Sequence, residues 1–280
     1  MVERVTNGTR FLATGAVSRG NVGLVDRTKS VLAAVNDRLM PQRVVFHHVP
    51  KCGGTSVGRA LRKRFILSQA TVVPESSFRA FEAFTGRTDR EAMLVDVLDL
   101  REQMLLYYLF EDVRCVSLHV RFSNTAYDLF QERYKFVTIL REPVARFVSH
   151  YFWSYRKAGA HARIDEDFER FLETPRARRL GASYVEYFSG LPKEEDVTTS
   201  RAISLAIENL RRMDVVGRLD DLDEFRRRMH EELGVRVKIG HENKMRQPAS
   251  RKSEVVTPEL TEKVRELCAP DIAVWEAMHG

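Results

Sequence analysis

Short apolar runs recur along the chain and alternate with stretches in which apolar residues have helical spacing. The runs, many of them rich in β-branched residues, predict strands at 43–49, 69–73, 114–120, 136–140 and 214–217. Three of them, at 43–49, 114–120 and 136–140, are apolar enough to be buried on both faces, as strands of a parallel sheet are. Strands that alternate with helices predict an α/β domain of three layers, with a mainly parallel central sheet flanked by helices.

Capping residues predict where several helices begin. The expected caps are Thr55 or Ser56 after the first strand, Thr88 with Glu91, Asp221 with Glu224, and Thr257 before Pro258. Shorter helices are expected at 166–172 and 184–188, and a final amphipathic helix runs from Pro258 toward Trp275. The 280 residues, of which 44% are hydrophobic, can therefore bury a substantial core.

Basic residues outnumber acidic ones and give a net charge of +6 with an isoelectric point near 9.3. This balance favours polyanionic ligands, but it does not separate a nucleotide from an acidic glycan or a nucleic acid. The sequence contains no zinc-like Cys/His spacing, no recognition-helix signature and no nucleic-acid motif. Nucleic-acid binding is therefore a minor alternative.

The three cysteines are far apart and odd in number, so we expect no disulfide framework and a reducing compartment. No segment approaches the roughly 20 apolar residues that cross a membrane, and residues 1–40 lack the pattern of a signal peptide. We expect a cytoplasmic protein with an N-terminal leader at 1–40, weakly helical at 24–39, and one domain at 41–280.

The stretch RVVFHHVPKCGGTSVGRALRKR at 43–64 predicts a strand, a glycine turn and the start of a helix. In this arrangement backbone N–H groups and the helix dipole point at one place, which makes an anion site. Lys51 precedes both glycines, whereas the lysine of a nucleotide P-loop follows the last glycine. Taken alone, Gly53 and Gly54 also fit an ordinary tight loop.

A second stretch, KFVTILREPVARFVSHYFWSY at 135–155, predicts a strand followed by a helix. Arg141 then lies at the carboxyl end of the strand, Pro143 occupies the first helical turn, and Ser149 lies about two turns into the helix. Each residue has a plain structural alternative, a strand-end charge for Arg141 and a solvated helix position for Ser149. Two candidate anion-binding stretches, each formed by a strand followed by a helix, are harder to obtain by chance than one.

These two stretches resemble the donor-binding motifs of sulfotransferases that use 3'-phosphoadenosine 5'-phosphosulfate (PAPS), in particular the carbohydrate (glycan O-) sulfotransferases. The resemblance covers about 43–277, with weak matching at 155–210, and it implies the P-loop-like sulfotransferase fold in a bacterial protein. It also implies a site for the 5'-phosphosulfate and a site for the 3'-phosphate. The residues implied in donor binding are Lys51, Cys52, Gly53, Gly54, Thr55, Ser56, Arg141 and Ser149, with Ser250 and Arg251 in a basic loop at 240–253.

His119 is the polar exception near the carboxyl end of the predicted strand at 114–120. Ligands of open parallel sheets bind at that edge, so His119 is expected to face the same crevice as Lys51 and Arg141. From the strand alone, a hydrogen-bonded histidine at the rim of the core is the simpler interpretation. The resemblance favours a catalytic base instead, because the similar glycan sulfotransferases have a histidine there. Ser117 replaces a further histidine of some of these relatives.

Other residues remain open between a functional and a structural role. Cys52 has a basic neighbour in His47 or His48 and a helix N-terminus that could activate it, but small residues of several kinds fit its position in the loop. The basic clusters Arg176/Arg178/Arg179 and Arg226/Arg227/Arg228 either bind an acidic acceptor or form solvated faces.

The sequence therefore predicts a sulfotransferase that moves a sulfuryl group from PAPS to a hydroxyl, on a carbohydrate or another acceptor that can be acidic. Lys51 and the loop N–H groups are expected to stabilise the leaving phosphate, and His119 to accept the proton of the hydroxyl. No metal is expected. The alternatives are a non-catalytic relative that binds PAPS or a glycan, and a P-loop nucleotide kinase.

Overall fold

The computed structural model describes residues 27, 28, 31, 34, 35, 38, 41–159, 161–234, 236–240 and 255–280. The chain divides into two compact units, 1–41 and 42–280. In the first unit the described residues from 27 to 38 are helical and exposed. Ser250 and Arg251, which the sequence places in a donor-binding loop, lie outside the described residues.

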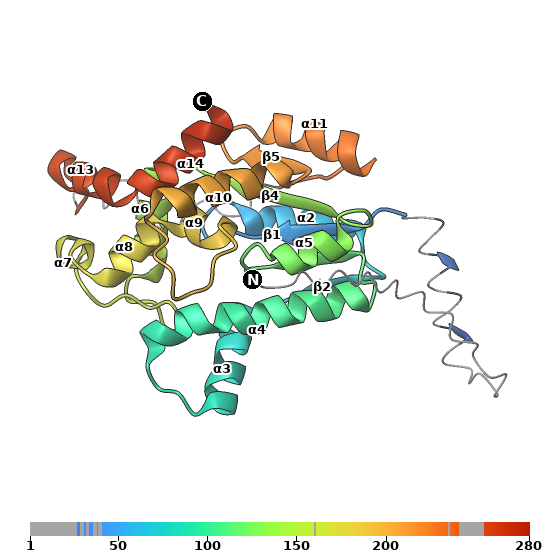
Figure 1. Ribbon diagram of the computed structural model, residues 1–280, viewed down its shortest axis with the longest axis horizontal. Helices are drawn as coiled ribbons and strands as arrows, with labels where there is room; N and C mark the ends of the chain where they lie inside the picture. The colour runs from blue at the N-terminus through green and yellow to red at the C-terminus, as the bar shows by residue number, and fades with distance from the viewer. Residues whose placement is uncertain are drawn as a thin grey trace, which may run out of the picture. The chain divides into compact units, whose positions relative to one another are not determined.

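The second unit is built on a sheet of five parallel strands in the order β2-β3-β1-β4-β5 (Figure 1). The strands are β1 (Val44–His47), β2 (Gln69–Thr71), β3 (Cys115–Leu118), β4 (Lys135–Leu140) and β5 (Val215–Arg218). All five predicted strands are present, although the first three end earlier than predicted. β1, β3 and β4 are almost wholly buried, because their valine, isoleucine and phenylalanine side chains meet helices on both faces.

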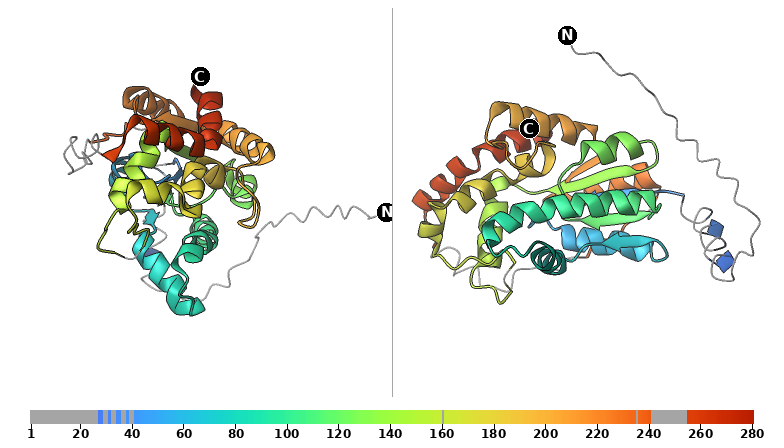
Figure 2. Two further views of the ribbon diagram at one scale, coloured as in Figure 1. Left: turned by 90° about the vertical axis from the view of Figure 1, so that its left-hand side faces the viewer. Right: turned by 60° about the horizontal axis from the view of Figure 1, so that its bottom comes forward.

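Helices join the strands and flank the sheet on both sides (Figures 1 and 2). They are α2 (Gly54–Arg64), α3 (Pro74–Thr85), α4 (Arg90–Phe110), α5 (Asn124–Phe130), α6 (Pro143–Ser154), α7 (Phe168–Leu172), α8 (Pro175–Gly181), α9 (Ser183–Phe188), α10 (Ser200–Arg212), α11 (Leu222–Leu233), α13 (Pro258–Leu267) and α14 (Ala269–His279). α2 and α4 pack on β3, and α11 packs on β4 and β5. The three-layer α/β arrangement predicted from the sequence is confirmed.

Two predicted helix caps are confirmed. The Asp221 carboxylate accepts a hydrogen bond from a backbone N–H in the first turn of α11, and the Thr257 hydroxyl does the same for α13. The single final helix is wrong, because α13 ends before Cys268 and α14 starts after it. The helices α5, α8 and α10 are not among the predicted elements.

Two other predicted caps are wrong. α2 begins directly after Gly53, which has a φ of 76° and offers no side chain, so neither Thr55 nor Ser56 caps it. α4 is capped by Asp89 rather than Thr88, and the Asp89 carboxylate accepts hydrogen bonds from two backbone N–H groups. A left-handed glycine reverses the chain without any side-chain cap. The hydroxyls of Thr55 and Ser56 therefore remain on the wall of the cavity described below.

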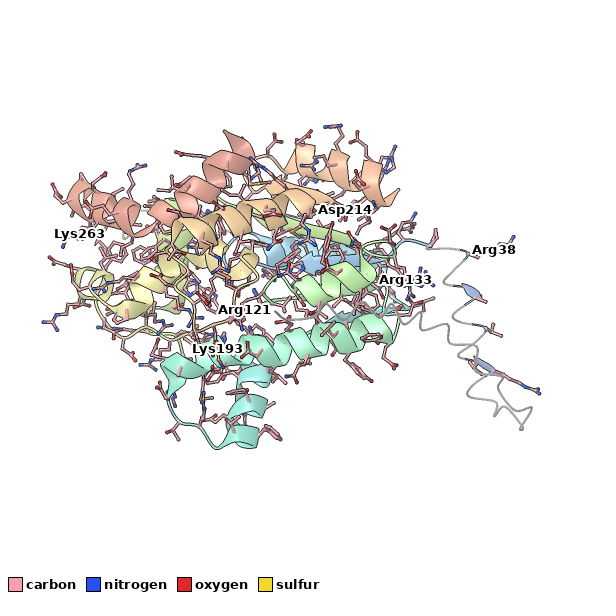
Figure 3. The ribbon with its side chains drawn as sticks, in the orientation of Figure 1. Arg38, Arg121, Arg133, Lys193, Asp214 and Lys263 are labelled. Carbon is pink, nitrogen blue, oxygen red and sulfur yellow. The ribbon has the colours of Figure 1, made fainter. Side chains whose placement is uncertain are left out.

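Ion pairs hold α4 on the side that faces the segment after α9. Lys193 Nζ lies 2.6 Å from Asp96 Oδ1 and 3.0 Å from Asp99 Oδ2, and Arg121 also pairs with Asp99. Figure 3 labels Lys193 and Arg121, which lie close together above α4. Asp96 and Asp99 thus point toward this segment and leave another face of the helix for apolar contacts.

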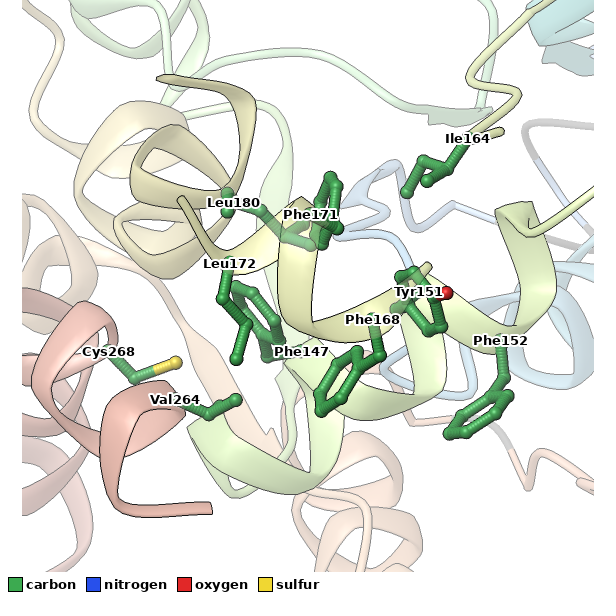
Figure 4. Close-up of a cluster of buried hydrophobic side chains, with 11 residues drawn as sticks. Phe147, Tyr151, Phe152, Ile164, Phe168, Phe171, Leu172, Leu180, Val264 and Cys268 are labelled. Carbon is green, nitrogen blue, oxygen red and sulfur yellow. The ribbon is translucent and has the colours of Figure 1, made fainter. Parts of the chain in front are cut away.

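A second buried cluster lies beyond the sheet, between α6, α7, α8 and α13 (Figure 4). Its aromatic members are Phe147, Tyr151, Phe152, Phe168 and Phe171. Val264 of α13 and Cys268, between α13 and α14, complete it. The cluster fixes the segment between α6 and α9, for which the sequence predicted only two short helices, as a packed layer.

Candidate functional site

The strand order places β1 between β3 and β4, so the chain changes direction across the sheet at β1. A crevice is expected outside the carboxyl ends of strands at such a point. A cavity of about 1730 Å³ lies there, lined by residues that follow four strands within a few positions: Lys51 after β1, His119 after β3, Arg141 after β4 and Leu219 after β5. The topology thus brings together the residues that the sequence predicted to share this edge.

The loop between β1 and α2 has an unusual backbone. Lys51 and Gly53 both have positive φ, at 69° and 76°, and a non-glycine residue in this region is uncommon. A Cβ on Gly53 would lie 2.4 Å from Leu219 Cδ1, and a Cβ on Gly54 would lie 1.9 Å from the His48 ring. Neither glycine can therefore carry a side chain. The N–H groups of Ser56 and Val57 donate to Gly53 O, at 3.1 and 3.5 Å, which leaves those of Gly54 and Thr55 to bind an anion.

Cys52 is the member of this loop that the structure does not bring to the cavity wall. Its side chain is fully buried, and its Sγ lies 3.5 Å from the hydroxyl of Tyr184. Its backbone N–H donates to Val49 O over 3.4 Å. Burial raises the pKa of the Cys52 thiol to about 11, although Arg146, Tyr184 and Arg141 oppose the rise. A protonated, buried thiol is not a nucleophile, and Cys52 acts here as a small packing residue.

Arg141 and Ser149, the predicted 3'-phosphate residues, line the same cavity as Lys51. The Tyr184 hydroxyl holds the backbone of Arg141, accepting from its N–H at 2.9 Å and donating to its carbonyl. The Arg141 guanidinium also lies 3.4 Å from Lys51 O, which joins the two predicted phosphate loops. Glu142 caps α6 through the N–H groups of its first turn, so this carboxylate supports the helix that carries Ser149.

A buried ion pair lies behind these residues. Arg146 on α6 and Asp271 on α14 are both fully buried, with 3.2 Å between Nη2 and Oδ2. The other carboxylate oxygen of Asp271 accepts from the N–H groups of Tyr184 and Val185, at 2.7 and 3.3 Å. Burial raises the pKa of Asp271 to about 7, against the opposing effects of Arg146 and the two N–H groups. The pair fixes α14 and α9 against α6, and thereby places Tyr184 beside Arg141.

His119 follows β3 directly and stacks on His48, with ring centroids 3.8 Å apart. Both rings are half-buried and line the cavity. Burial holds the pKa of His119 well below 6.5, and the charges of His48 and Arg101 lower it further, against a hydrogen bond to the His48 backbone. Burial also lowers the pKa of His48, to about 3, and the charges of Arg62 and Lys51 lower it further. Both imidazoles are therefore neutral at pH 7 and able to accept a proton.

His47, the other histidine at the end of β1, lies elsewhere. His47 points to the opposite face of β1, where its ring packs against Phe122, Phe136 and Phe188 and its Nδ1 lies 3.5 Å from Val120 O. It does not line the cavity. The geometry leaves His119 and His48 as the histidines beside the donor loop.

The cavity also contains residues that the sequence analysis did not single out. His150, Trp153 and His161 line it, and Lys51 Nζ lies 5.4 Å from the centroid of the Trp153 ring. Burial, followed by nearby cations, holds the pKa of His150 well below 6.5 and lowers that of His161 to about 4. His150 and Trp153 both lie in the stretch at 135–155, where His150 follows Ser149 directly. His161 comes from a loop whose position depends on the second buried cluster.

The first basic cluster is divided by the structure. Arg176 and Arg179 line the cavity and Arg178 does not. Arg176 Nη1 lies 3.0 Å from Glu91 Oε1, and Arg179 forms a two-pronged pair with Glu186. These charges are compensated within the cavity wall.

The second basic cluster, Arg226/Arg227/Arg228, lies on α11. Arg226 and Arg227 pair with carboxylates of the same helix, and Arg228 donates to the carbonyls of Val216 and Asp214. None of the three lines the cavity. Ion pairs on the surface of α11 and hydrogen bonds to backbone carbonyls at β5 therefore account for these three arginines.

All three cysteines are free and buried. No helix in the described part of the chain combines the length and apolar character of a membrane span. Within the same residues, no group of three or more His, Cys, Asp or Glu side chains is arranged to hold a metal ion.

Comparison with known proteins gives a family and a solved structure to which the chain is similar. A model of the sulfotransferase family matches residues 39–273. The crystal structure of a sulfotransferase from Alicyclobacillus acidocaldarius is 19% identical and aligns with a TM-score of 0.49 over 84% of this chain and 95% of that chain. No curated protein sequence matches the chain.

Proposed function

The chain belongs to the sulfotransferase family, and we propose that it transfers the sulfuryl group of PAPS to the hydroxyl of an acceptor. The observation that carries this proposal is the single cavity that Lys51, the N-terminus of α2, Arg141 and Ser149 line together. Two anion sites joined by the contact between Arg141 and Lys51 O suit a donor with phosphates at both its 5' and 3' positions.

The residues present fit such a donor. Gly53 and Gly54 line the cavity, and the N–H groups of Gly54 and Thr55 lie at the start of α2, where a helix favours an anion. Arg141 presents a planar guanidinium, which suits a terminal phosphate, and Ser149 adds a hydroxyl from α6. Trp153 offers an aromatic face beside Lys51. Cys52 contributes to the shape of the loop, whereas Ser250 and Arg251 remain predictions.

In the proposed reaction the acceptor hydroxyl attacks sulfur in line with the leaving phosphate oxygen. Lys51 and the loop N–H groups stabilise the negative charge that develops on that oxygen. His119 accepts the hydroxyl proton as the new sulfur–oxygen bond forms. The low pKa of His119 keeps its imidazole neutral before the donor binds, and the negative charge of the bound donor raises that pKa toward neutrality.

The two rival functions make different predictions about the site. A nucleotide kinase of the P-loop class needs a lysine after the last glycine, where this chain has Thr55. A non-catalytic relative has no need for both Lys51 and His119 in one cavity. A carbohydrate acceptor and a cytoplasmic location stay predictions from the sequence.

The donor proposal is tested by ligand-induced stabilisation. The product 3',5'-diphosphoadenosine should raise the melting temperature without added metal, because a ligand at about 100 times its Kd stabilises the folded state by about 2.7 kcal/mol. The comparison ligands are 5'-AMP and ATP with magnesium. Equal stabilisation by 5'-AMP would exclude a 3'-phosphate site, and a preference for magnesium-ATP would favour the kinase.

A further inference from the structure

The cavity is larger than a donor needs. Sites for one small molecule usually enclose about 300 to 1,000 Å³, whereas this cavity measures about 1730 Å³. The predicted donor residues come from the loop after β1, the start of α2, the end of β4 and the middle of α6. The remaining wall comes from α3, α4 and the segment between α6 and α9, and it leaves room for an acceptor.

One face of α4 forms the longest part of that wall. Its cavity-lining residues are Glu91, Ala92, Leu94, Val95, Leu98 and Arg101. They recur at helical spacing, and the rise of an α-helix spreads them over about 15 Å. Arg101 lies at the inner end, where its Nη1 is 3.3 Å from His119 O. The stripe therefore leads outward from the proposed base, and it is apolar between its charged ends.

The wall across from this stripe is apolar at its base and ion-paired at its rim. The pair between Glu91 and Arg176 shows that α8 lies directly across the cavity from the start of α4. Phe171, Pro175 and Leu180 line the cavity near Arg176. Phe171 and Leu180 belong to the buried cluster of Figure 4, which holds this wall in place.

The arginine side chains in this region already have hydrogen-bond or ion-pair partners. Arg176 donates to Glu91 and also to Arg163 O at 2.7 Å, and Arg179 is held by Glu186. The buried guanidinium of Arg101 donates to Ser77, His119 O and Pro74 O. An acidic acceptor would have to compete with carboxylates already in place, at the cost of leaving them unpaired. An uncharged apolar group replaces only water along the stripe.

Building on the proposed function, we propose that the acceptor carries its hydroxyl on an uncharged apolar body, such as an aromatic ring or a short alkyl chain. This body lies along Leu94, Val95 and Leu98, while the hydroxyl reaches His119. The acceptor class is thus a phenol or an apolar alcohol, and not an acidic glycan.

An acceptor series tests this inference with PAPS as the donor. The probes are 2-naphthol, octyl glucoside, glucose and hyaluronan, which separate an apolar body from a sugar and from an acidic chain. We expect kcat/KM for 2-naphthol and octyl glucoside to exceed that for glucose and hyaluronan by about 10- to 100-fold, the range that small apolar differences produce in a pocket.

The same series separates failure of the inference from failure of the proposed function. If 3',5'-diphosphoadenosine stabilises the protein but hyaluronan or glucose is preferred, or no apolar probe is sulfated, the acceptor class is wrong. If 3',5'-diphosphoadenosine does not stabilise the protein, the proposed function itself fails.

Matched variants on α4 test the place of binding. Leu94 and Leu106 are both half-buried leucines of this helix, but only Leu94 lines the cavity. Leu94→Asn should lower kcat/KM for 2-naphthol about 10-fold without changing the affinity for 3',5'-diphosphoadenosine, and Leu106→Asn should change neither. Val95→Thr, which keeps the side-chain shape, gives a milder second variant if Leu94→Asn does not fold. Equal effects at 94 and 106, or an equal loss with glucose, would overturn the inference.

Discussion

The cavity has a proposed donor end, at Lys51, Arg141 and Ser149, and a proposed acceptor end, between α4 and α8. The two ends are held in different ways. At the donor end, buried contacts fix the residues: Tyr184 binds the backbone of Arg141, and the pair of Arg146 and Asp271 is fully buried. At the acceptor end, α4 and α8 are joined by a pair at the rim, in which the side chain of Glu91 is 59% exposed. Breaking a buried pair is costly, whereas an exposed pair contributes little.

This difference matches the demands of the two ligands. A donor that is the same in every turnover suits a rigid site, because fixed dipoles need no reorganisation when charge develops. A wall of apolar side chains with exposed pairs at its rim can change its residues at little cost in stability. We therefore expect substitutions at the donor end to affect folding and donor affinity together, and those at the acceptor end to affect acceptor choice alone.

The largest effect is expected at the junction of the two ends. His119→Ala should lower turnover by about 10² to 10⁴, the usual contribution of a positioned base, and should leave the affinity for 3',5'-diphosphoadenosine nearly unchanged. Steady-state kinetics and ligand titration measure the two quantities. The control is His48→Ala. If His48→Ala loses activity while His119→Ala stays within a few fold of the wild type, the base is His48, after β1, and not His119.

The pH profile of the wild type adds a readout on the same residue. The active form is the neutral imidazole, so activity rises with pH. With limiting PAPS, kcat/KM reports the free enzyme, and its acid limb should lie below pH 6.5, because burial lowers the pKa of His119. The limb of kcat should lie at higher pH, since the bound donor favours the imidazolium.

The buried ion pair should dominate stability at the donor end. Arg146→Met leaves the Asp271 carboxylate buried without its cation, and we expect a loss of about 3 to 5 kcal/mol in the free energy of unfolding. Urea denaturation measures it. Adding Asp271→Asn removes the orphaned charge and should recover part of the loss. A double variant as unstable as Arg146→Met would show that packing, not charge, holds α14.

Next in size is the separation of the two phosphate sites. Arg141→Ala should weaken binding of 3',5'-diphosphoadenosine by about 2 to 5 kcal/mol, the cost of truncating one partner of a buried charged pair. Lys51→Ala should lower turnover more than affinity, because its charge acts on the leaving oxygen. Titration and kinetics on both variants make the comparison. The same kinetic phenotype in both would contradict the proposed division of labour.

A smaller effect is expected from Tyr184, which supports Arg141 without lining the cavity. Tyr184→Phe leaves the Arg141 N–H without its acceptor, which costs about 1 to 3 kcal/mol for a buried group. We expect affinity for 3',5'-diphosphoadenosine to fall about 10-fold while affinity for 5'-AMP changes less. Tyr187→Phe removes a hydroxyl from the same helix and serves as the control. Parallel losses for both nucleotides would mean that Tyr184 only stabilises the fold.

The smallest effect is expected at the acceptor rim. Glu91→Gln should change the free energy of unfolding by less than about 1 kcal/mol, because the carboxylate is exposed. It should also improve sulfation of hyaluronan relative to 2-naphthol, since Arg176 loses its counter-ion. Glu102→Gln, on the same helix and outside the cavity, is the control. A large loss of stability would show that the two ends are not held differently.

The sequence by itself determined the local chemistry of the donor end. The strand, glycine turn and helix at 43–64 and the strand and helix at 135–155 are local patterns, and both have the predicted order. The caps at Thr55 and Thr88 were wrong because glycine and aspartate offered closer alternatives that local spacing does not rank. Family membership, shown by the match over residues 39–273, agrees with what these motifs resembled.

Only the tertiary structure decided what surrounds these motifs. The burial of Cys52, the stacking of His48 on His119, and the link from Asp271 through Tyr184 to Arg141 join residues far apart in the chain. The ion pair between Arg176 and Glu91 likewise depends on α8 packing near α4, so the sequence alone did not show that Arg176 has a counter-ion. Hydrophobic periodicity reports which face of an element is buried, but not which element packs against it. For that reason the proposed acceptor side, built from α3, α4 and the segment between α6 and α9, could not be predicted from the sequence.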